Sequence, residues 1–106
     1  MRLPIYQIDA FTDRLFAGNP AAVCPMERWL PDATLQAIAA ENNLAETAYF
    51  VREGDQYVLR WFTPVVEVDL CGHATLASAF LIFTEIEPNR SQVVFRTLKA
   101  GVLTVK

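Results

Sequence analysis

The sequence has few of the residues that hold metal ions or build disulfide frameworks. It contains one histidine, His73, and two cysteines, Cys24 and Cys71. A structural zinc site takes four ligands, and a disulfide framework takes a larger, even set of cysteines at recurring spacings. These three residues are too few for either arrangement, so we expect no metal site, no metal cofactor and no disulfide framework.

Clustered positive charge is also missing. Nine Lys and Arg residues stand against twelve Asp and Glu residues, the net charge is −3, and the basic residues are scattered singly. Nucleic acids and anionic membranes are bound by basic patches. The charge pattern therefore predicts no nucleic-acid partner and no membrane partner.

Long apolar runs are absent as well. The run at residues 76–83 has only about eight apolar residues, whereas a membrane-spanning helix needs about 20. The N-terminus shows no charged-then-apolar leader with a cleavage site, so we expect a reducing, cytoplasmic setting. A chain of 106 residues fits one domain, 1–106, and its 53% hydrophobic content predicts a core with apolar surface left over for a partner.

What the sequence does contain is a segment that is apolar on every side. Between Leu76 and Phe83 the one polar residue is Ser78, so no polar stripe recurs every three to four residues. A helix that is hydrophobic all round is buried all round. We therefore predict a helix over residues 74–83 that the rest of the protein wraps.

The other segments alternate between β-type composition and turn signals. A loop is predicted at 11–20, and a helix is predicted to begin near Pro31 and to end near Asn42 and Asn43. Strands are predicted at 3–10, 21–24, 46–51, 56–62, 92–97 and 102–106, the last four as two hairpins. The predicted fold class is α+β, with a mostly antiparallel, β-barrel-like sheet wrapped around the central buried helix.

The turn that leads into the buried helix carries the first candidate functional residue, His73. A lone histidine is most often a packing or surface residue. Here it stands at the start of a buried helix, directly after Gly72, where unpaired backbone N–H groups form a ready anion site. A histidine side chain can exchange a proton or act as a neutral hydrogen-bond donor, which suits a functional site.

Glu46 is the second candidate, because it lies between a predicted helix and an apolar strand. One interpretation is a solvated carboxylate in a connection, which is what most glutamates are. The other is a carboxylate at the edge of the core, where desolvation favours its protonated form and allows it to act as general base and acid. Glu67 and Asp69 alternate with valines, which favours a solvated strand face, although Asp69 could orient His73.

The two cysteines call for different interpretations. Cys24 lies inside an apolar strand and is interpreted as structural. Cys71 is either a small buried hydrophobe or, at a helix N-terminus, a stabilised and reactive thiolate. The segment from Gly18 to Pro20 predicts a turn whose backbone, including Asn19, could also line a site.

Taken together, these segments resemble the PhzF-like family of phenazine-biosynthesis-like isomerases. Five blocks in the same order carry the resemblance over most of the first 80 residues. They are Asp9–Thr12, Phe16–Val23, Glu41–Ala48, Arg60–Pro64 and Glu67–Thr75. The resemblance implies a diaminopimelate-epimerase-like fold, in which each of two lobes is a β-barrel closed around a central helix.

The resemblance also implies roles for individual residues. Glu46 matches the catalytic glutamate and His73 the active-site histidine, while Asn19, Gly72 and Ala74 fall in stretches that line the substrate pocket. In the best-known member the substrate is trans-2,3-dihydro-3-hydroxyanthranilate. The implied activity is isomerisation of a small cyclic carboxylate by proton transfer through the glutamate, without metal or organic cofactor.

Two-lobed family members carry their active site between the lobes, and the sequence matches the first lobe. The second lobe would supply a further catalytic aspartate, so a homodimer is expected to stand in for the two-lobed molecule. Two alternatives stay open. Cys71 also resembles the catalytic cysteine of proline racemases and diaminopimelate epimerases, and the chain could instead be an inactive half-domain that serves as an oligomerisation or binding module.

Overall fold

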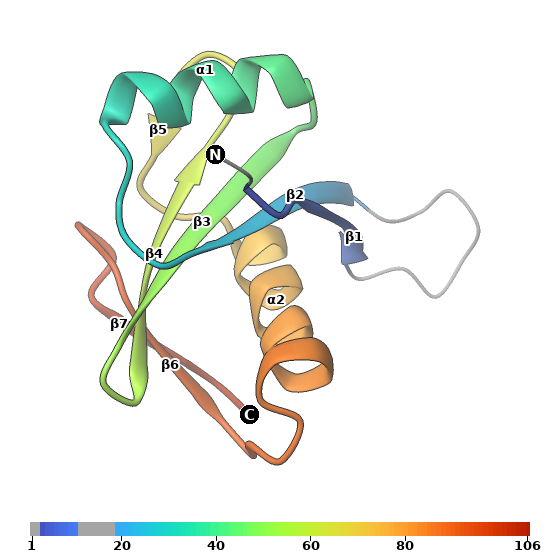
Figure 1. Ribbon diagram of the computed structural model, residues 1–106, viewed down its shortest axis with the longest axis vertical. Coiled ribbons are helices and arrows are strands. Elements are labelled where there is room, and N and C mark those ends of the chain that lie inside the picture. The colour runs from blue at the N-terminus through green and yellow to red at the C-terminus, as the bar shows by residue number, and fades with distance from the viewer. Residues whose placement is uncertain (1–2, 11–18) are drawn as a thin grey trace.

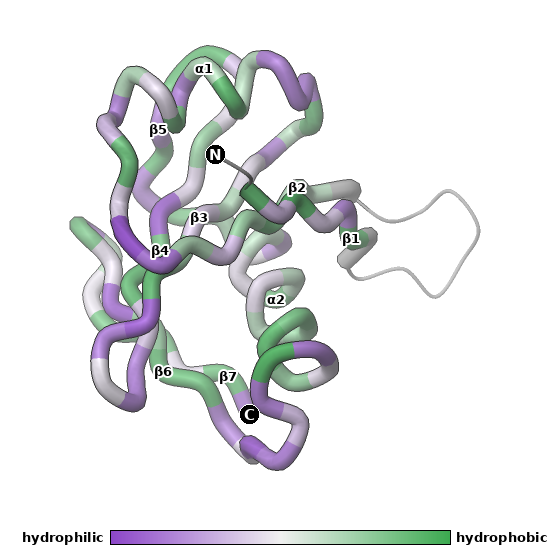
Figure 2. The backbone as a smooth tube through the Cα atoms, viewed as in Figure 1, coloured by the Kyte–Doolittle hydropathy of each residue, from purple (hydrophilic) through white to green (hydrophobic). Residues whose placement is uncertain are grey.

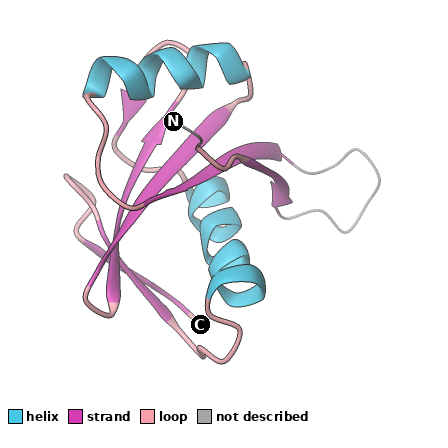
Figure 3. Ribbon diagram, viewed as in Figure 1, coloured by secondary structure: helices cyan, strands magenta, loops and turns pink. Residues whose placement is uncertain are grey.

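The computed structural model describes the backbone of residues 3–10 and 19–106, and the side chains of residues 3–8 and 21–106. The predicted loop at 11–20 therefore lies almost entirely outside the described residues. Within them the chain forms a sheet, two α-helices and a π-helical turn (Figures 1 and 3). The strands are β1 Tyr6–Ala10, β2 Asn19–Met26, β3 Glu46–Glu53, β4 Gln56–Phe62, β5 Glu67–Val68, β6 Val93–Arg96 and β7 Val102–Val105. The helices are α1 Asp32–Asn42, α2 Gly72–Leu81 and the π-helical turn η1 Ile82–Ile86.

The sheet is mixed, with the strand order β1-β2-β3-β4-β6-β7 and with β5 paired to β4. The pairs β1–β2, β3–β4, β4–β5 and β6–β7 are antiparallel, whereas β2–β3 and β4–β6 are parallel. Parallel neighbours need a crossover connection. Here α1 lies in the first crossover and α2 in the second, so each helix is carried across a face of the sheet.

The two helices pack on opposite faces of the sheet. Side chains on a strand alternate between faces, and on β3 Ala48 and Phe50 join the core around α2, whereas Tyr49 joins the core around α1. The Tyr49 hydroxyl donates to the Leu35 carbonyl at 2.8 Å, which ties α1 to this strand. Neither helix of the described residues has the length and the apolar character that crossing a membrane requires.

The prediction that the sheet closes into a barrel around a helix buried on every side is wrong. The described sheet has two ends, β1 and β7, and it is open between them. Most of α2 is buried, but Phe80 is 58% exposed, and Leu76 and Phe83 are half-buried on the same stripe. In Figure 2 much of the C-terminal half of α2 has the colour of hydrophobic residues. The apolar run therefore predicted a central helix correctly. It did not predict that the stripe of Leu76, Phe80 and Phe83 is only partly covered.

The predicted turns are confirmed where the structure describes them. Asn43 ends α1 in the left-handed conformation, with φ of 52°. The β3–β4 hairpin pairs Glu53 with Gln56 across two residues, and Gly54 takes a φ of 66° that favours glycine. The second predicted hairpin is the β6–β7 pair. The alternation at residues 66–69 is confirmed by β5, whereas the sequence patterns did not predict the two parallel pairings.

Arg60 on β4 links three elements through its guanidinium. Its Nε and Nη2 donate to the two Glu67 oxygens at 2.8 Å each, and its Nη1 donates to Asp32 at 3.0 Å. The guanidinium also lies over the rings of Trp29 and Phe62, with centroid distances of 5.3 and 5.4 Å. The hydrogen bond and the positive charge of Arg60 lower the pKa of Asp32. Glu67, predicted to belong to a solvated face, is instead part of this ion-pair network.

We expect Arg60→Met to lower the free energy of unfolding by about 2 kcal/mol, because it removes charge-assisted hydrogen bonds and leaves half-buried Glu67 without its partner. The matched control is Arg96→Met, which removes an ion pair with Glu53 in which both side chains are about half exposed. Such a surface pair contributes less than about 1 kcal/mol. Urea unfolding of both variants checks the difference, and equal losses would contradict it.

Candidate functional site

The start of α2 presents backbone N–H groups that no earlier turn of helix can satisfy. The first intrahelical hydrogen bond runs from the Thr75 N–H to the Cys71 carbonyl at 3.0 Å, so the N–H groups of Gly72, His73 and Ala74 precede it. Cys71 is the N-cap residue, with an extended backbone. The N–H groups of His73 and Ala74 reach its sulfur. Gly72 is exposed, which leaves this helix end open to a ligand.

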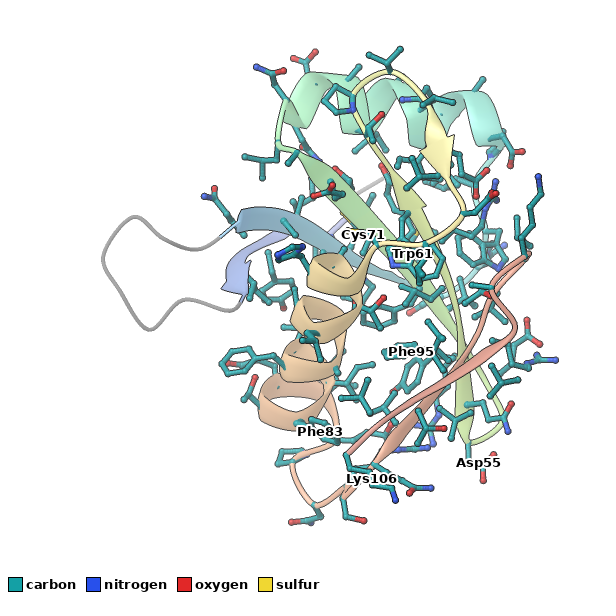
Figure 4. All side chains as sticks on the ribbon, turned by 180° about the vertical axis from the view of Figure 1, so that it is seen from behind. Asp55, Trp61, Cys71, Phe83, Phe95 and Lys106 are labelled. Atoms are coloured by element: carbon teal, nitrogen blue, oxygen red, sulfur yellow. The ribbon has the colours of Figure 1, made fainter. Side chains whose placement is uncertain are left out.

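Buried hydrogen bonds fix this helix start to the sheet. The Trp61 indole N–H donates to Thr75 Oγ1 at 3.0 Å, and that hydroxyl donates to the Cys71 carbonyl at 2.7 Å. Trp61 is 2% exposed and Thr75 is 6% exposed. Figure 4 shows Cys71 and Trp61 together at the N-terminal end of α2. Trp61 and Thr75 were not among the predicted site residues. The four-residue spacing of Cys71 and Thr75 is nevertheless a signal for a hydrogen bond from the hydroxyl to the carbonyl.

Glu46 comes to the same corner from the sheet. It is the first residue of β3, and the alternation of side chains puts it on the face of Ala48 and Phe50, which pack around α2. Its half-buried side chain lies near the Cys71 thiol, close enough to raise the pKa of that thiol. The structure therefore brings a carboxylate from the start of β3 to a thiol and a helix N-terminus that lie in a distant part of the sequence.

The Cys71 thiol is held in its neutral form. Burial raises its pKa, and the nearby Glu46 carboxylate raises it further, while the N–H groups of Ala74 and His73 act in the opposite direction without reversing the shift. The raised pKa favours the interpretation of Cys71 as a small, partly buried hydrophobe over that of a reactive thiolate, because desolvation outweighs the favourable helix terminus. Cys24 is buried, and burial raises its pKa to about 12, as its interpretation as a structural residue requires.

The other predicted site residues lie on α2, at the start of β2 and on the exposed surface. His73 is half-buried at the second position of α2, and Ala74 follows it, fully buried. The backbone of Asn19 begins β2, two residues before Ala21, whose partner on β3 is Glu46; the Asn19 side chain lies outside the described residues. Asp69 pairs with Lys99 at 3.8 Å on the exposed surface.

Two cavities among the described residues lie away from Glu46 and His73. One, of about 700 Å³, is lined by residues 3–4, 25–28 and 30, and a smaller one lies beside Arg60 and Lys99. Across 3–10 and 19–106, no three His, Cys, Asp or Glu side chains gather into a group able to hold a metal ion. The candidate site is thus an open corner of the lobe, and its catalytic role stays a prediction.

We expect iodoacetamide to alkylate Cys71 slowly at neutral pH, because its raised pKa leaves little thiolate. Glu46→Gln removes a negative charge beside the sulfur, so the pKa of Cys71 falls and its alkylation at pH 8 becomes faster. Peptide mass spectrometry of the alkylation rate as a function of pH measures this shift.

The matched control for this experiment is Glu41→Gln, which neutralises an exposed glutamate on α1. Cys24 serves as an internal reference, since a buried thiol with a pKa near 12 stays unreacted. Superimposable pH profiles for the wild type and Glu46→Gln would contradict the contact between Glu46 and Cys71.

A family model, individual relatives and solved structures all match this chain to phenazine biosynthesis-like proteins. A family model described as phenazine biosynthesis-like protein matches residues 8–106. An uncharacterized isomerase of Pseudomonas aeruginosa is 55% identical over 106 residues, which is all of this chain and 40% of that protein. The phenazine biosynthesis-like domain-containing protein of Homo sapiens is 49% identical over 106 residues, 92% of this chain and 37% of its own length.

Among solved structures, a phenazine biosynthesis protein of the PhzF family from Enterococcus faecalis is 52% identical and superposes with a TM-score of 0.94. The match covers all of this chain and 40% of that one. The chain thus spans about 40% of the length of the relatives that it matches, which is one lobe. On this evidence the chain belongs to the phenazine biosynthesis-like, or PhzF, family.

Proposed function

We propose that this chain supplies one wall of an isomerase active site, in which Glu46 moves a proton on a small cyclic carboxylate. The observation that carries the proposal is the meeting of the Glu46 side chain with the start of α2. Relatives at 55% and 49% identity are named uncharacterized isomerases, and these names give no substrate. The proposal therefore depends on the chemistry of this corner.

The helix start and Glu46 have complementary tasks in this reaction. The exposed start of α2, with the N–H group of Gly72, binds the substrate carboxylate, as helix N-termini bind anions generally. Glu46 takes a proton from a ring carbon, the electron pair of that C–H bond forms a new double bond, and the existing double bond shifts. Glu46 then returns the proton to the carbon at the far end of the shifted system, so no redox partner is needed. His73 positions the substrate or donates a hydrogen bond to it.

Glu46 is the better candidate base than Cys71. A thiol base must be a thiolate when it acts, and burial together with the Glu46 carboxylate keeps Cys71 protonated near neutral pH. The racemase-type alternative also needs a second cysteine, and Cys24 is buried on β2 in the core around α1. These observations favour the carboxylate mechanism over a pair of cysteines.

Glu46→Gln should lower the rate of proton transfer by about 10² to 10⁴, the usual cost of losing a general base or acid. Ligand binding should change little, because the amide keeps the size and polarity of the side chain. Incorporation of solvent deuterium into trans-2,3-dihydro-3-hydroxyanthranilate and simpler cyclohexadiene carboxylates, followed by NMR, measures the rate.

Two variants make this test specific. Glu41→Gln, exposed on α1, should keep the wild-type rate. Cys71→Ser separates the two mechanisms, since a hydroxyl replaces the thiol's hydrogen bonding but not its basicity. Loss of exchange in Cys71→Ser as deep as in Glu46→Gln would favour a thiol base. A wild-type rate in Glu46→Gln would refute the proposed function.

We further propose that a second copy of the chain completes the site as a homodimer. Large apolar side chains are exposed near the open corner and along the uncovered stripe of α2. They include Val65 (84%), Val66 (55%), Leu70 (59%) and Phe80 (58%). Exposed large apolar side chains favour an interface, and a two-fold pair brings the same residues of each copy together.

Phe80→Glu should shift the chain toward the monomer, because it puts a charge into the apolar stripe that the dimer would bury. Light scattering at concentrations from about 1 to 100 μM gives the mass. Lys106→Gln, which changes the charge by the same amount at the exposed end of β7, is the control. A wild-type chain that stays monomeric throughout would contradict the homodimer and favour a binding module for another partner.

A further inference from the structure

Hydroxyl groups along α2 and η1 donate to the backbone carbonyl four residues earlier, a common bond inside helices. Within the described residues they belong to Thr75, Ser78 and Thr84. Thr75 differs from the other two because its oxygen also accepts the indole N–H of Trp61, a residue of β4, at 3.0 Å. The carbonyl that Thr75 meets is that of Cys71, which lies with Trp61 at the N-terminal end of α2 (Figure 4).

The chemistry of the two partners of Thr75 fixes the direction of both bonds. An indole N–H can only donate and a backbone carbonyl can only accept, whereas a hydroxyl has one hydrogen and two lone pairs. The Thr75 oxygen therefore accepts from Trp61 and gives its single hydrogen to the Cys71 carbonyl. Trp61 and Thr75 are both buried, so water has little access to compete for either bond.

The Cys71 carbonyl accepts two hydrogen bonds from the same residue. One comes from the Thr75 hydroxyl at 2.7 Å and the other from the Thr75 N–H at 3.0 Å. This carbonyl and the Gly72 N–H belong to one planar peptide group, and no peptide bond of the described residues is cis. In a trans peptide the N–H points opposite to the carbonyl. A carbonyl held toward the first turn of α2 therefore directs the Gly72 N–H outward, at the exposed start of the helix.

We propose that Thr75, held by Trp61, is a positioning residue for the substrate carboxylate and acts through the peptide between Cys71 and Gly72. The proposal rests on the proposed function, which assigns the substrate carboxylate to this helix start. The bonds at the carbonyl fix the plane of the peptide and with it the direction of the Gly72 N–H. They also make that N–H a stronger donor, because hydrogen bonds in a chain polarise one another.

A spectroscopic test follows the Gly72 amide directly and needs no substrate. The chain has four glycines, so labelling glycine alone with ¹⁵N gives very few amide signals. Gly72→Ala assigns the signal, and a Cβ at this position would meet no described atom within 4 Å. Thr75→Val keeps the shape of the side chain but loses the hydroxyl, so the Gly72 nitrogen signal should move upfield. Thr75→Ser keeps the hydroxyl and should restore it.

Two controls show whether the shift is specific. The signals of Gly54 and Gly101, which lie in hairpin turns, should stay in place in every Thr75 variant. Thr84→Val removes the same kind of bond on the exposed side of η1 and should leave the Gly72 signal unmoved. A wild-type Gly72 signal in folded Thr75→Val would overturn the proposal.

Loss of the hydroxyl leaves the buried Trp61 N–H without its acceptor, which destabilises the fold. Circular dichroism shows whether Thr75→Val is folded. If it is not, Trp61→Phe/Thr75→Val removes donor and acceptor together, and Trp61→Phe/Thr75→Ser is its matched partner with the hydroxyl retained. The Gly72 signal of the first double variant should lie upfield of that of the second, and identical signals would overturn the proposal.

Benzoate tests whether this orientation matters for binding a carboxylate. Benzoate should move the wild-type Gly72 signal, and Thr75→Val should raise its Kd about 2- to 10-fold, the usual worth of one hydrogen bond. Thr75→Ser should restore the Kd. Benzamide, which has the same ring without the charge, should leave the Gly72 signal in place. An unchanged Kd for benzoate in Thr75→Val would overturn the positioning role.

Kinetics separate this proposal from the proposed function. In the deuterium-exchange assay Thr75→Val should raise KM about 2- to 10-fold with little change in kcat, because the carboxylate is bound alike before and during proton transfer. If Glu46→Gln is inactive while Thr75→Val keeps the wild-type KM, the positioning role fails and the proposed function stands. If Glu46→Gln exchanges normally, or benzoate leaves the wild-type Gly72 signal unmoved, the proposed function fails. The Gly72 signal of Thr75→Val then still decides whether Thr75 holds this peptide.

Discussion

The structure depends on covering one helix that has almost no polar surface. Ala74, Ala77, Ala79 and Leu81 of α2 are at most 2% exposed, and they pack among apolar side chains of several strands. Small alanines let the helix approach the sheet closely, and larger residues such as Phe50 supply the covering volume. Strands from both halves of the sheet pack against α2, and the described sheet stays open between β1 and β7. The exposed stripe at Phe80 is the part of the apolar helix surface that the sheet does not cover.

The same packing creates the candidate site. The side chains of Glu46, Ala48 and Phe50 share one face of β3, and the last two fix the distance between this strand and α2. Trp61 lies opposite Ala48 on β4 and reaches the first turn of the helix through Thr75. The same core therefore positions both the Glu46 carboxylate and the start of α2. A change in that core would move both.

The sequence predicted local structure well, because periodicity and turn chemistry are local signals. The helix at α2, the end of α1 at Asn43 and both hairpins follow from patterns of a few residues. Closure of the sheet and the parallel pairings depend on relations between distant segments, and no local pattern encodes them. The same limit applies to the site: His73 and Glu46 could be named as candidates, whereas the contact of Glu46 with Cys71 and the support from Trp61 required the tertiary structure.

Cys71 shows why a sequence motif alone gives an incomplete account of a thiol. A cysteine followed by glycine at a helix start suggests a stabilised thiolate, because the first N–H groups of a helix favour negative charge. In this fold two N–H groups do reach the sulfur, yet burial and a neighbouring carboxylate oppose them and the pKa rises. Burial is the largest cause of the rise, and the neighbouring Glu46 carboxylate adds to it, because two anions close together are disfavoured. The surroundings that the fold builds around a thiol therefore decide its charge, and a helix start alone does not.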